Sequence, residues 1–184
     1  GIGLDNRIGP KFLHAGPGYG GSCFPKDTLA LLKTAQDNET PVRVVEAVVQ
    51  ANDLRKRAMG RKIINALGGD VRGLKIGLLG LTFKPNTDDI REAPALEMID
   101  ALLERGAKVQ CYDPEAMNNV QRILGDKVVF AEKMYAALEG ADFLVIATEW
   151  PEFRTPDFAK IESLLKEKVI FDGRNVFEMD TMRK

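Results

Sequence analysis

The chain has 184 residues, of which 45% are hydrophobic and 29% charged, and its 26 basic and 27 acidic residues leave a formal net charge of -1. This balance provides no basic surplus for a phosphate backbone, so nucleic acid is not an expected partner. No apolar run approaches the roughly 20 residues of a membrane span and the first residues lack the order of a signal peptide, so we expect a cytoplasmic protein with no membrane partner.

The first third of the chain is expected to be a loop followed by two helices. Residues 1–24 carry loop and turn chemistry and no initiator Met, which leads us to expect a fragment of a longer protein. Proline suits the first helical turn and predicts a short helix from Pro25 to near Asn38. A second helix of about 27 residues, Pro41 to Leu67, exceeds the average of ~11 to 12. Such a helix is typical of a connection between domains or a dimer contact, and an ordinary core helix is the alternative.

From Gly73 onward, short apolar strands alternate with helices. Strands are predicted at residues 75–81, 108–112, 128–130, 143–147 and 169–171, and helices at 93–105, 115–124, 133–138 and 157–165. This alternation indicates an α/β fold, in which the long connecting helix is followed by a doubly wound parallel Rossmann-like sheet of five to six strands. We therefore expect two parts, residues 1–72 and residues 73–184.

Ligands of such sheets bind beyond the carboxyl ends of the strands. The loop of residues 82–92 follows the first strand and is longer than the usual ~2 to 6 residues, which suggests a function. It lacks the G-x-G-x-x-G pattern of a dinucleotide site. Lys84 and Arg91 could supply charge to a phosphate and Phe83 a flat face to a base, with a solvated loop as the alternative.

Further candidates follow the last two strands. Arg174 comes after F-D-G, where a guanidinium suits a phosphate or a ribose, and the alternative is a salt bridge to Asp172 or a neighbouring carboxylate. Glu149 and Trp150 lie at the adjacent strand end, where a capping acid and a packed indole are the simpler interpretations.

The two cysteines have different surroundings. Cys111 lies on a strand that should be covered on both faces, so we expect a small core side chain. Cys23 lies where the loop G-P-G-Y-G-G-S runs into a helix, and the positive end of that helix, with Lys26, favours a reactive thiolate. Asp27 lies about one turn further on. The residues alone leave a buried structural Cys23 equally open.

The sequence gives little support to a metal site or to a cysteine hydrolase. The two cysteines have no CxxC or Cys/His spacing, so no metal is expected. A cysteine hydrolase would need the only histidine, His14, as its base, and we expect a surface histidine instead.

Several motifs together resemble the nucleotide-sugar dehydrogenases of the UDP-glucose/GDP-mannose dehydrogenase family. They are R-I-G-P-K-F-L, G-Y-G-G-S-C-F-P-K-D, G-L-T-F-K-P-N-T-D-D-I-R-E-A-P, Y-D-P, T-E-W and F-D-G-R. The resemblance implies an NAD-dependent, two-step oxidation of a sugar alcohol to an acid, with Cys23 as the nucleophile and Asp27 assisting hydrolysis. T-E-W and F-K-P-N-T-D-D favour UDP-glucose as the substrate, and GDP-mannose is the alternative.

The resemblance also implies ligand contacts and a domain plan. The substrate-binding residues would be Arg7, Phe12, Leu13, Tyr19, Gly20, Phe83, Lys84 and Arg174, and the cofactor-binding residues Ser22, Lys26 and Arg91. Residues 1–72 would hold the cysteine loop and the helix of a homodimer, with Arg7 reaching across it, and residues 73–184 would be the C-terminal UDP-sugar-binding domain.

The family's N-terminal NAD-binding half has no counterpart in this chain. We therefore expect a C-terminal portion that binds substrate but is inactive by itself. A non-catalytic nucleotide-sugar binding and dimerisation module is the alternative from a different class of function.

Overall fold

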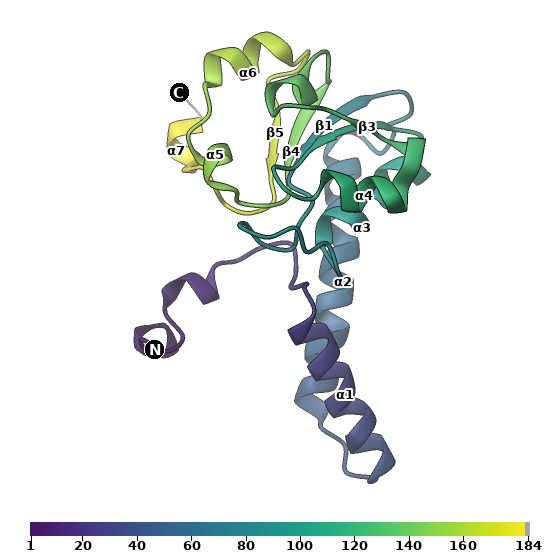
Figure 1. Cartoon of the computed structure of the whole chain (residues 1–184), viewed down its shortest axis with the longest axis vertical. Helices are drawn as coiled ribbons and strands as arrows, with labels where there is room; N and C mark the ends of the chain where they lie inside the picture. The colour runs from purple at the N-terminus through teal and green to yellow at the C-terminus, as the bar shows by residue number, and fades with distance from the viewer. Residues whose placement is uncertain (183–184) are drawn as a thin grey trace.

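A computed structural model of the chain describes residues 1–182, except for the side chains of Lys11, Phe12, Met179 and Thr181. Figure 1 shows a rounded α/β part, from which a hairpin of two helices projects. The hairpin consists of α1 (Cys23–Asp37) and α2 (Arg43–Ala66). A segment with two short 3-10 helices, η1 (Ile2–Leu4) and η2 (Pro10–Leu13), precedes α1 and extends to one side.

The two predicted helices are present with slightly different ends. α1 begins at Cys23, two residues before Pro25, and the connection to α2 contains Glu39 in a left-handed conformation with φ of 51°. α2 has 24 residues and its second half packs on α3 (Pro94–Glu104). The two helix axes come close because α2 has Gly60 opposite Ala101, and a Cβ at Gly60 would lie 2.6 Å from the Ala101 Cβ.

The α/β part is built on five strands, all parallel, in the order β3-β2-β1-β4-β5. The strands are β1 (Lys75–Leu79), β2 (Lys108–Tyr112), β3 (Val129–Phe130), β4 (Phe143–Ile146) and β5 (Ile170–Asp172). The register places Leu78 of β1 opposite Cys111 of β2 and Val145 of β4. The prediction of a doubly wound parallel sheet is confirmed.

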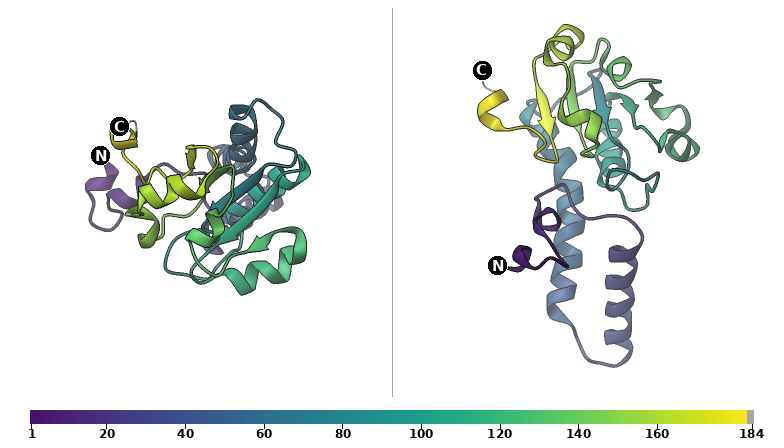
Figure 2. Two further views of the ribbon diagram at one scale, coloured as in Figure 1. Left: turned by 90° about the horizontal axis from the view of Figure 1, so that it is seen from above. Right: turned by 60° about the vertical axis from the view of Figure 1, so that its left-hand side comes forward.

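Helices cover both faces of this sheet, as Figure 2 shows from two further directions. One face packs under α2, α3 and α4 (Met117–Leu124), and the other under η4 (Tyr135–Leu138), α5 (Pro151–Arg154) and α6 (Phe158–Leu164). Because both faces are covered, the strands are nearly continuous apolar runs. Cys111 is 0% exposed in this core, which confirms its expected packing role.

Several short elements differ from the prediction. The helix predicted at residues 133–138 is a shorter 3-10 helix of residues 135–138, and α5, η3 (Gly125–Lys127) and α7 (Met179–Met182) were not predicted. β1 ends at Leu79, earlier than expected, because Gly80 turns the chain with φ of +90° and packs against Thr148. Within residues 1–182, no helix combines the length and the apolar character that crossing a membrane requires.

Candidate active site

Cys23 is the first residue of α1, and its side chain is exposed. The Ser22 hydroxyl lies 3.7 Å from the Cys23 sulfur. The thiol therefore lies at the positive end of a 15-residue helix, at the place where unpaired backbone N–H groups gather. Among the described residues Cys23 is therefore not a core side chain.

The loop of residues 16–22, which we call the Cys23 loop, is docked on residues 82–92, the β1–α3 loop. A Cβ at Gly20 would lie 2.3 Å from the carbonyl oxygen of Glu92, and one at Gly21 would lie 2.7 Å from the Phe83 ring. The Gly21 N–H donates to the carbonyl oxygen of Arg91 at 2.8 Å. Only glycine allows this approach, so Gly20 and Gly21 bring Cys23 beside the β1–α3 loop.

Two buried polar residues of α2 form hydrogen bonds with these two loops. Asn52 clamps the Tyr19 backbone, since its Oδ1 accepts from the Tyr19 N–H at 2.8 Å and its Nδ2 donates to the Tyr19 carbonyl at 3.1 Å. Lys56 donates from Nζ to Glu92 Oε2 at 2.7 Å. Sequence reasoning missed both functions. The available signal was two polar residues, four apart, within the apolar stripe of a long helix.

Arg174 is held at the carboxyl end of β5. Its Nη2 donates to Glu149 Oε1 at 2.7 Å, its Nε bonds Glu149 Oε2, and its backbone N–H donates to Asp172 Oδ1 at 2.9 Å. Burial opposes ionisation of Glu149, but the hydrogen bonds and charge of Arg174 outweigh it and hold the pKa of Glu149 below its usual value. The structure therefore shows the ion pair that the sequence left open as the alternative for Arg174, and the partner is Glu149.

The same arginine lies against the Cys23 loop. A Cβ at Gly16 would come within 2.8 Å of Arg174 Nη1, and Asn175 donates from Nδ2 to the carbonyl of Ala15 at 3.2 Å. The carboxyl end of β5, the Cys23 loop and the β1–α3 loop thus meet at one edge of the sheet.

A buried carboxylate occupies the carboxyl end of the central strands. Asp113 is 1% exposed, and its Oδ2 accepts from the Leu81 N–H at 2.7 Å and from Trp150 Nε1 at 3.0 Å. Its Oδ1 accepts from the backbone N–H groups of Glu115 and Ala116. The structure confirms that Trp150 is a packed indole. The Leu81 N–H follows β1, where a dinucleotide pyrophosphate would bind, so this sheet does not fit a dinucleotide.

The charged candidates near Cys23 form local ion pairs. Lys26 lies 3.4 Å from Asp27, and Arg91 lies 2.7 Å from Asp89. Hydrogen bonds and charge from Asp89 raise the pKa of Arg91, and the charge of Cys23 adds a smaller effect in the same direction. Lys84 Nζ lies 5.3 Å from the centre of the Phe83 ring, in a cation–π contact.

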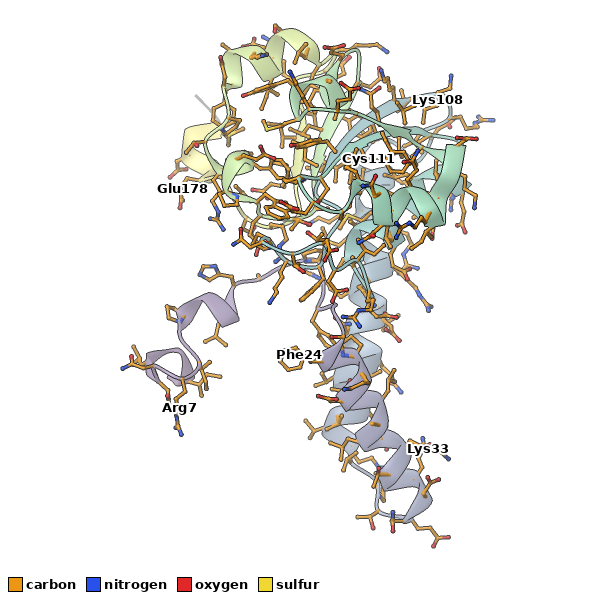
Figure 3. The ribbon with its side chains drawn as sticks, in the orientation of Figure 1. Arg7, Phe24, Lys33, Lys108, Cys111 and Glu178 are labelled. Carbon is orange, nitrogen blue, oxygen red and sulfur yellow. The ribbon has the colours of Figure 1, made fainter. Side chains whose placement is uncertain are left out.

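Not every predicted residue is brought to this edge. Arg7 is exposed and paired with Asp5, at 2.6 Å, and Figure 3 shows it at the far end of the N-terminal segment, away from Phe24 at the start of α1. Leu13 is exposed, and so is His14, as expected for a surface histidine. The side chain of Phe12 lies outside the described part. No described His, Cys, Asp and Glu residues are grouped to hold a metal ion.

Comparison with known proteins gives two family matches. The model described as "UDP-glucose/GDP-mannose dehydrogenase family, UDP binding domain" matches residues 77–179, and that family's "central domain" model matches residues 1–54. The two matches together cover the Cys23 loop, the β1–α3 loop and the sheet, except for the first two residues of β1.

Curated relatives align with the whole chain. It is 59% identical to the UDP-glucose 6-dehydrogenase of Rhizobium meliloti (strain 1021) and 46% identical to UDP-glucose 6-dehydrogenase TuaD of Bacillus subtilis (strain 168), over 100% of the chain in both cases. It spans only 42% and 40% of those two proteins. A solved UDP-glucose dehydrogenase from Pyrobaculum islandicum is 40% identical, with a TM-score of 0.81 over 95% of this chain and 39% of that one.

Proposed function

Because this chain belongs to the UDP-glucose/GDP-mannose dehydrogenase family, we propose that it carries the nucleophile and the UDP-sugar site of a UDP-glucose 6-dehydrogenase. One observation carries the proposal: the exposed Cys23 thiol begins α1 on a glycine loop that is docked against the β1–α3 loop. Residues 1–72 would form the nucleophile and dimerisation segment, and residues 73–184 the UDP-sugar-binding domain.

In this mechanism Cys23 holds the sugar C6 carbon covalently. Loss of a hydride and a proton from the alcohol would leave an aldehyde at C6, the thiolate would add to it, and the resulting alkoxide would take up a proton to give a thiohemiacetal. Loss of a second hydride and a proton would leave the same carbon as a thioester. Water then attacks the thioester carbonyl, the C–S bond breaks, and the thiolate and UDP-glucuronate are released. A thiol at an exposed helix N-terminus suits each of these steps, because the helix end stabilises negative charge.

Asp27 would assist the hydrolytic step. It lies one turn beyond Cys23 on α1, beside Lys26, and both side chains are largely exposed. A carboxylate there can take a proton from the attacking water. Backbone N–H groups of the glycine loop would stabilise the oxyanion that forms on the thioester carbonyl.

The substrate would lie in a cleft along the line where the Cys23 loop, the β1–α3 loop and the carboxyl end of β5 meet. Phe83 and Lys84 would offer a ring and a cation, Arg174 a guanidinium, and Tyr19 and Gly20 the contacts of the Cys23 loop. Phe12 and Leu13 would complete the cleft. Lys84 is exposed and carries no carboxylate partner at ion-pair distance among the described residues, which leaves its charge available for a diphosphate.

We include a homodimer in the proposal, with Arg7 supplied to the site of a second chain. The hairpin of α1 and α2 exposes several large apolar side chains, namely Leu29, Leu31, Val44, Val48 and Leu54. Such a surface on a projecting hairpin favours burial against another copy. The exposure of Arg7, far from Cys23 of its own chain, is consistent with this exchange.

NAD⁺ accepts hydride in this family's chemistry, and the sheet of this chain does not fit it. We therefore propose that NAD is bound mainly by residues outside these 184, while Ser22, Lys26 and Arg91 contact its edge. The isolated chain would bind UDP-glucose and produce no NADH. A cytoplasmic location is part of the same proposal, and cell fractionation would test it.

Calorimetric titration of the chain tests the substrate. UDP-glucose should bind and GDP-mannose should not, and Lys84→Ala should weaken the binding, with Lys108→Ala, an exposed residue at the amino end of β2, as the control. Preferential binding of GDP-mannose would indicate that the chain belongs to the GDP-mannose dehydrogenase branch of the family. Protection of Cys23 from alkylation by UDP-glucose would support its function as a nucleophile, whereas binding without protection would favour a non-catalytic module.

A further inference from the structure

Two loops that contribute to the proposed site are fastened to the same face of α2. Asn52 and Lys56 lie one turn apart on that helix and are 9% and 4% exposed. Asn52 holds the Cys23 loop through both polar atoms of the Tyr19 backbone. Lys56 holds the β1–α3 loop through Glu92.

Lys56 also touches the Cys23 loop directly. A Cβ at Gly18 would lie 2.7 Å from Lys56 Cγ and 3.0 Å from Asn52 Oδ1, so the backbone at Gly18 rests on both side chains. The aliphatic stem of Lys56 therefore supports one loop while its ammonium bonds the other. A buried ammonium is costly unless it is paired, which makes Glu92 a required partner.

The β1–α3 loop is shaped to accept these contacts. Glu92 adopts φ of +54°, a left-handed conformation that costs a non-glycine residue free energy. In this conformation the Glu92 carbonyl lies against Gly20, and its carboxylate reaches Lys56. The neighbouring Arg91 carbonyl accepts from the Gly21 N–H at 2.8 Å. Each loop thus contacts the other as well as α2.

From these contacts we propose that Asn52 and Lys56 are positioning residues, which join the Cys23 loop and the β1–α3 loop into one rigid unit and so fix the thiol relative to the groups that hold the nucleotide. The coupling of the loops is a property of the chain itself. Only the expected effect on substrate binding rests on the proposed function.

Hydrogen exchange on the chain tests the coupling. Asn52→Leu removes contacts to the Cys23 loop alone, yet we expect faster exchange in both residues 19–23 and residues 83–92, by about tenfold or more for the loss of its two hydrogen bonds to Tyr19. Lys56→Met should give the same pattern, Lys56→Arg should restore protection, and exposed Lys62→Met should have no effect. Faster exchange confined to residues 19–23 in Asn52→Leu would overturn the proposal.

A general loss of stability has a different signature. It would raise exchange across β1 and α3 as well, and such a uniform increase in both Asn52→Leu and Lys56→Met would show that the pair only stabilises the fold. The rate of Cys23 alkylation by iodoacetamide should change several-fold in Asn52→Leu and in Lys56→Met. The free energy of unfolding of Lys56→Arg should stay near that of the wild type.

The dependence on substrate is tested separately. Lys56→Met should weaken UDP-glucose binding although Lys56 is buried and its ammonium is paired with Glu92. If the unmodified chain fails to bind UDP-glucose, the proposed function fails while coupled exchange of the two loops still stands. If the unmodified chain binds and the loops exchange independently, only the inference about Asn52 and Lys56 fails.

Discussion

Arg174 and Glu149 face each other across the carboxyl ends of β5 and β4, where Arg174 Nη2 donates to Glu149 Oε1 at 2.7 Å. The second guanidinium nitrogen in the pair, Nε, bonds the other carboxylate oxygen. Two parallel bonds fix the plane of the guanidinium as well as its position. Glu149 thereby determines how Arg174 is presented to the Cys23 loop and to any phosphate bound there.

The pair predicts a pH-dependent contribution to stability. The folded-state pKa of Glu149 lies below its ordinary value of 4.5. The stabilisation is therefore complete above that value and is lost as the pH falls through the folded-state pKa. Glu149→Gln should lower the free energy of unfolding by about 1–3 kcal/mol near neutral pH. Urea unfolding at a series of pH values should show this difference shrinking in acid.

A matched variant separates this effect from general acid denaturation. Glu139 is exposed on the opposite side of the α/β part, before β4, so Glu139→Gln should leave the pH profile close to that of the wild type. A difference between wild type and Glu149→Gln that stays constant from neutral pH into acid would contradict the assignment.

Asp113 predicts a larger loss of stability. Its carboxylate accepts backbone N–H groups of Leu81, Glu115 and Ala116 as well as the indole of Trp150. Asp113→Ala would leave several buried donors unpaired, at about 1–3 kcal/mol for each group, so we expect a total loss of about 3 kcal/mol or more. Trp150 is the only tryptophan, and its fluorescence during urea unfolding measures this directly.

Exposed Asp126 provides the control for Asp113. Asp126→Ala removes the same chemical group from the exposed 3-10 helix η3, and the free energy of unfolding of this variant should stay within about 0.5 kcal/mol of wild type. Equal effects of the two substitutions would show that the Asp113 carboxylate does not tie the strand ends together.

The fold could be predicted from the sequence because the main helices and strands are each indicated by neighbouring residues. β2 was predicted at its observed bounds, because Val109 and Cys111 alternate with polar residues between a helix stop at Gly106 and the turn that begins after Tyr112. The elements that were not predicted are short: α5 has four residues and η3 has three, too few to show a helical period.

The candidate site was predicted less completely than the fold, because its geometry depends on contacts between residues that are far apart in the sequence. Cys23 at the start of a helix is a local feature and was visible. Asn52 contacts Tyr19, 33 residues away, and Lys56 contacts Glu92, 36 residues away. No pattern within α2 indicates which backbone a buried amide or ammonium will meet. For Arg174, both a free guanidinium and an ion pair fitted the sequence, and only the position of Glu149 distinguishes them.

The two cysteines should differ sharply in reactivity. Cys23 is exposed, whereas burial, with a smaller effect of Asp113, raises the pKa of Cys111 to about 12. Iodoacetamide should therefore label one thiol per native chain near neutral pH, and mass spectrometry should place it on Cys23. Cys23→Ala should abolish native labelling, and denaturant should make Cys111 react. Native labelling of Cys111 at a rate similar to that of Cys23 would contradict the packing of β2.

The close contact of α2 and α3 predicts an unusual response at Gly60. Alanine normally stabilises a helix interior by about 0.5–1 kcal/mol relative to glycine, but here its Cβ would lie 2.6 Å from that of Ala101. Overpacking costs about 1–3 kcal/mol, so Gly60→Ala should destabilise the chain in urea unfolding. In an Ala101→Gly background the clash disappears, and the same substitution should become stabilising by its helix propensity. Stabilisation by Gly60→Ala with Ala101 intact would mean that the two helices can separate without loss of the packing that anchors the hairpin to the sheet.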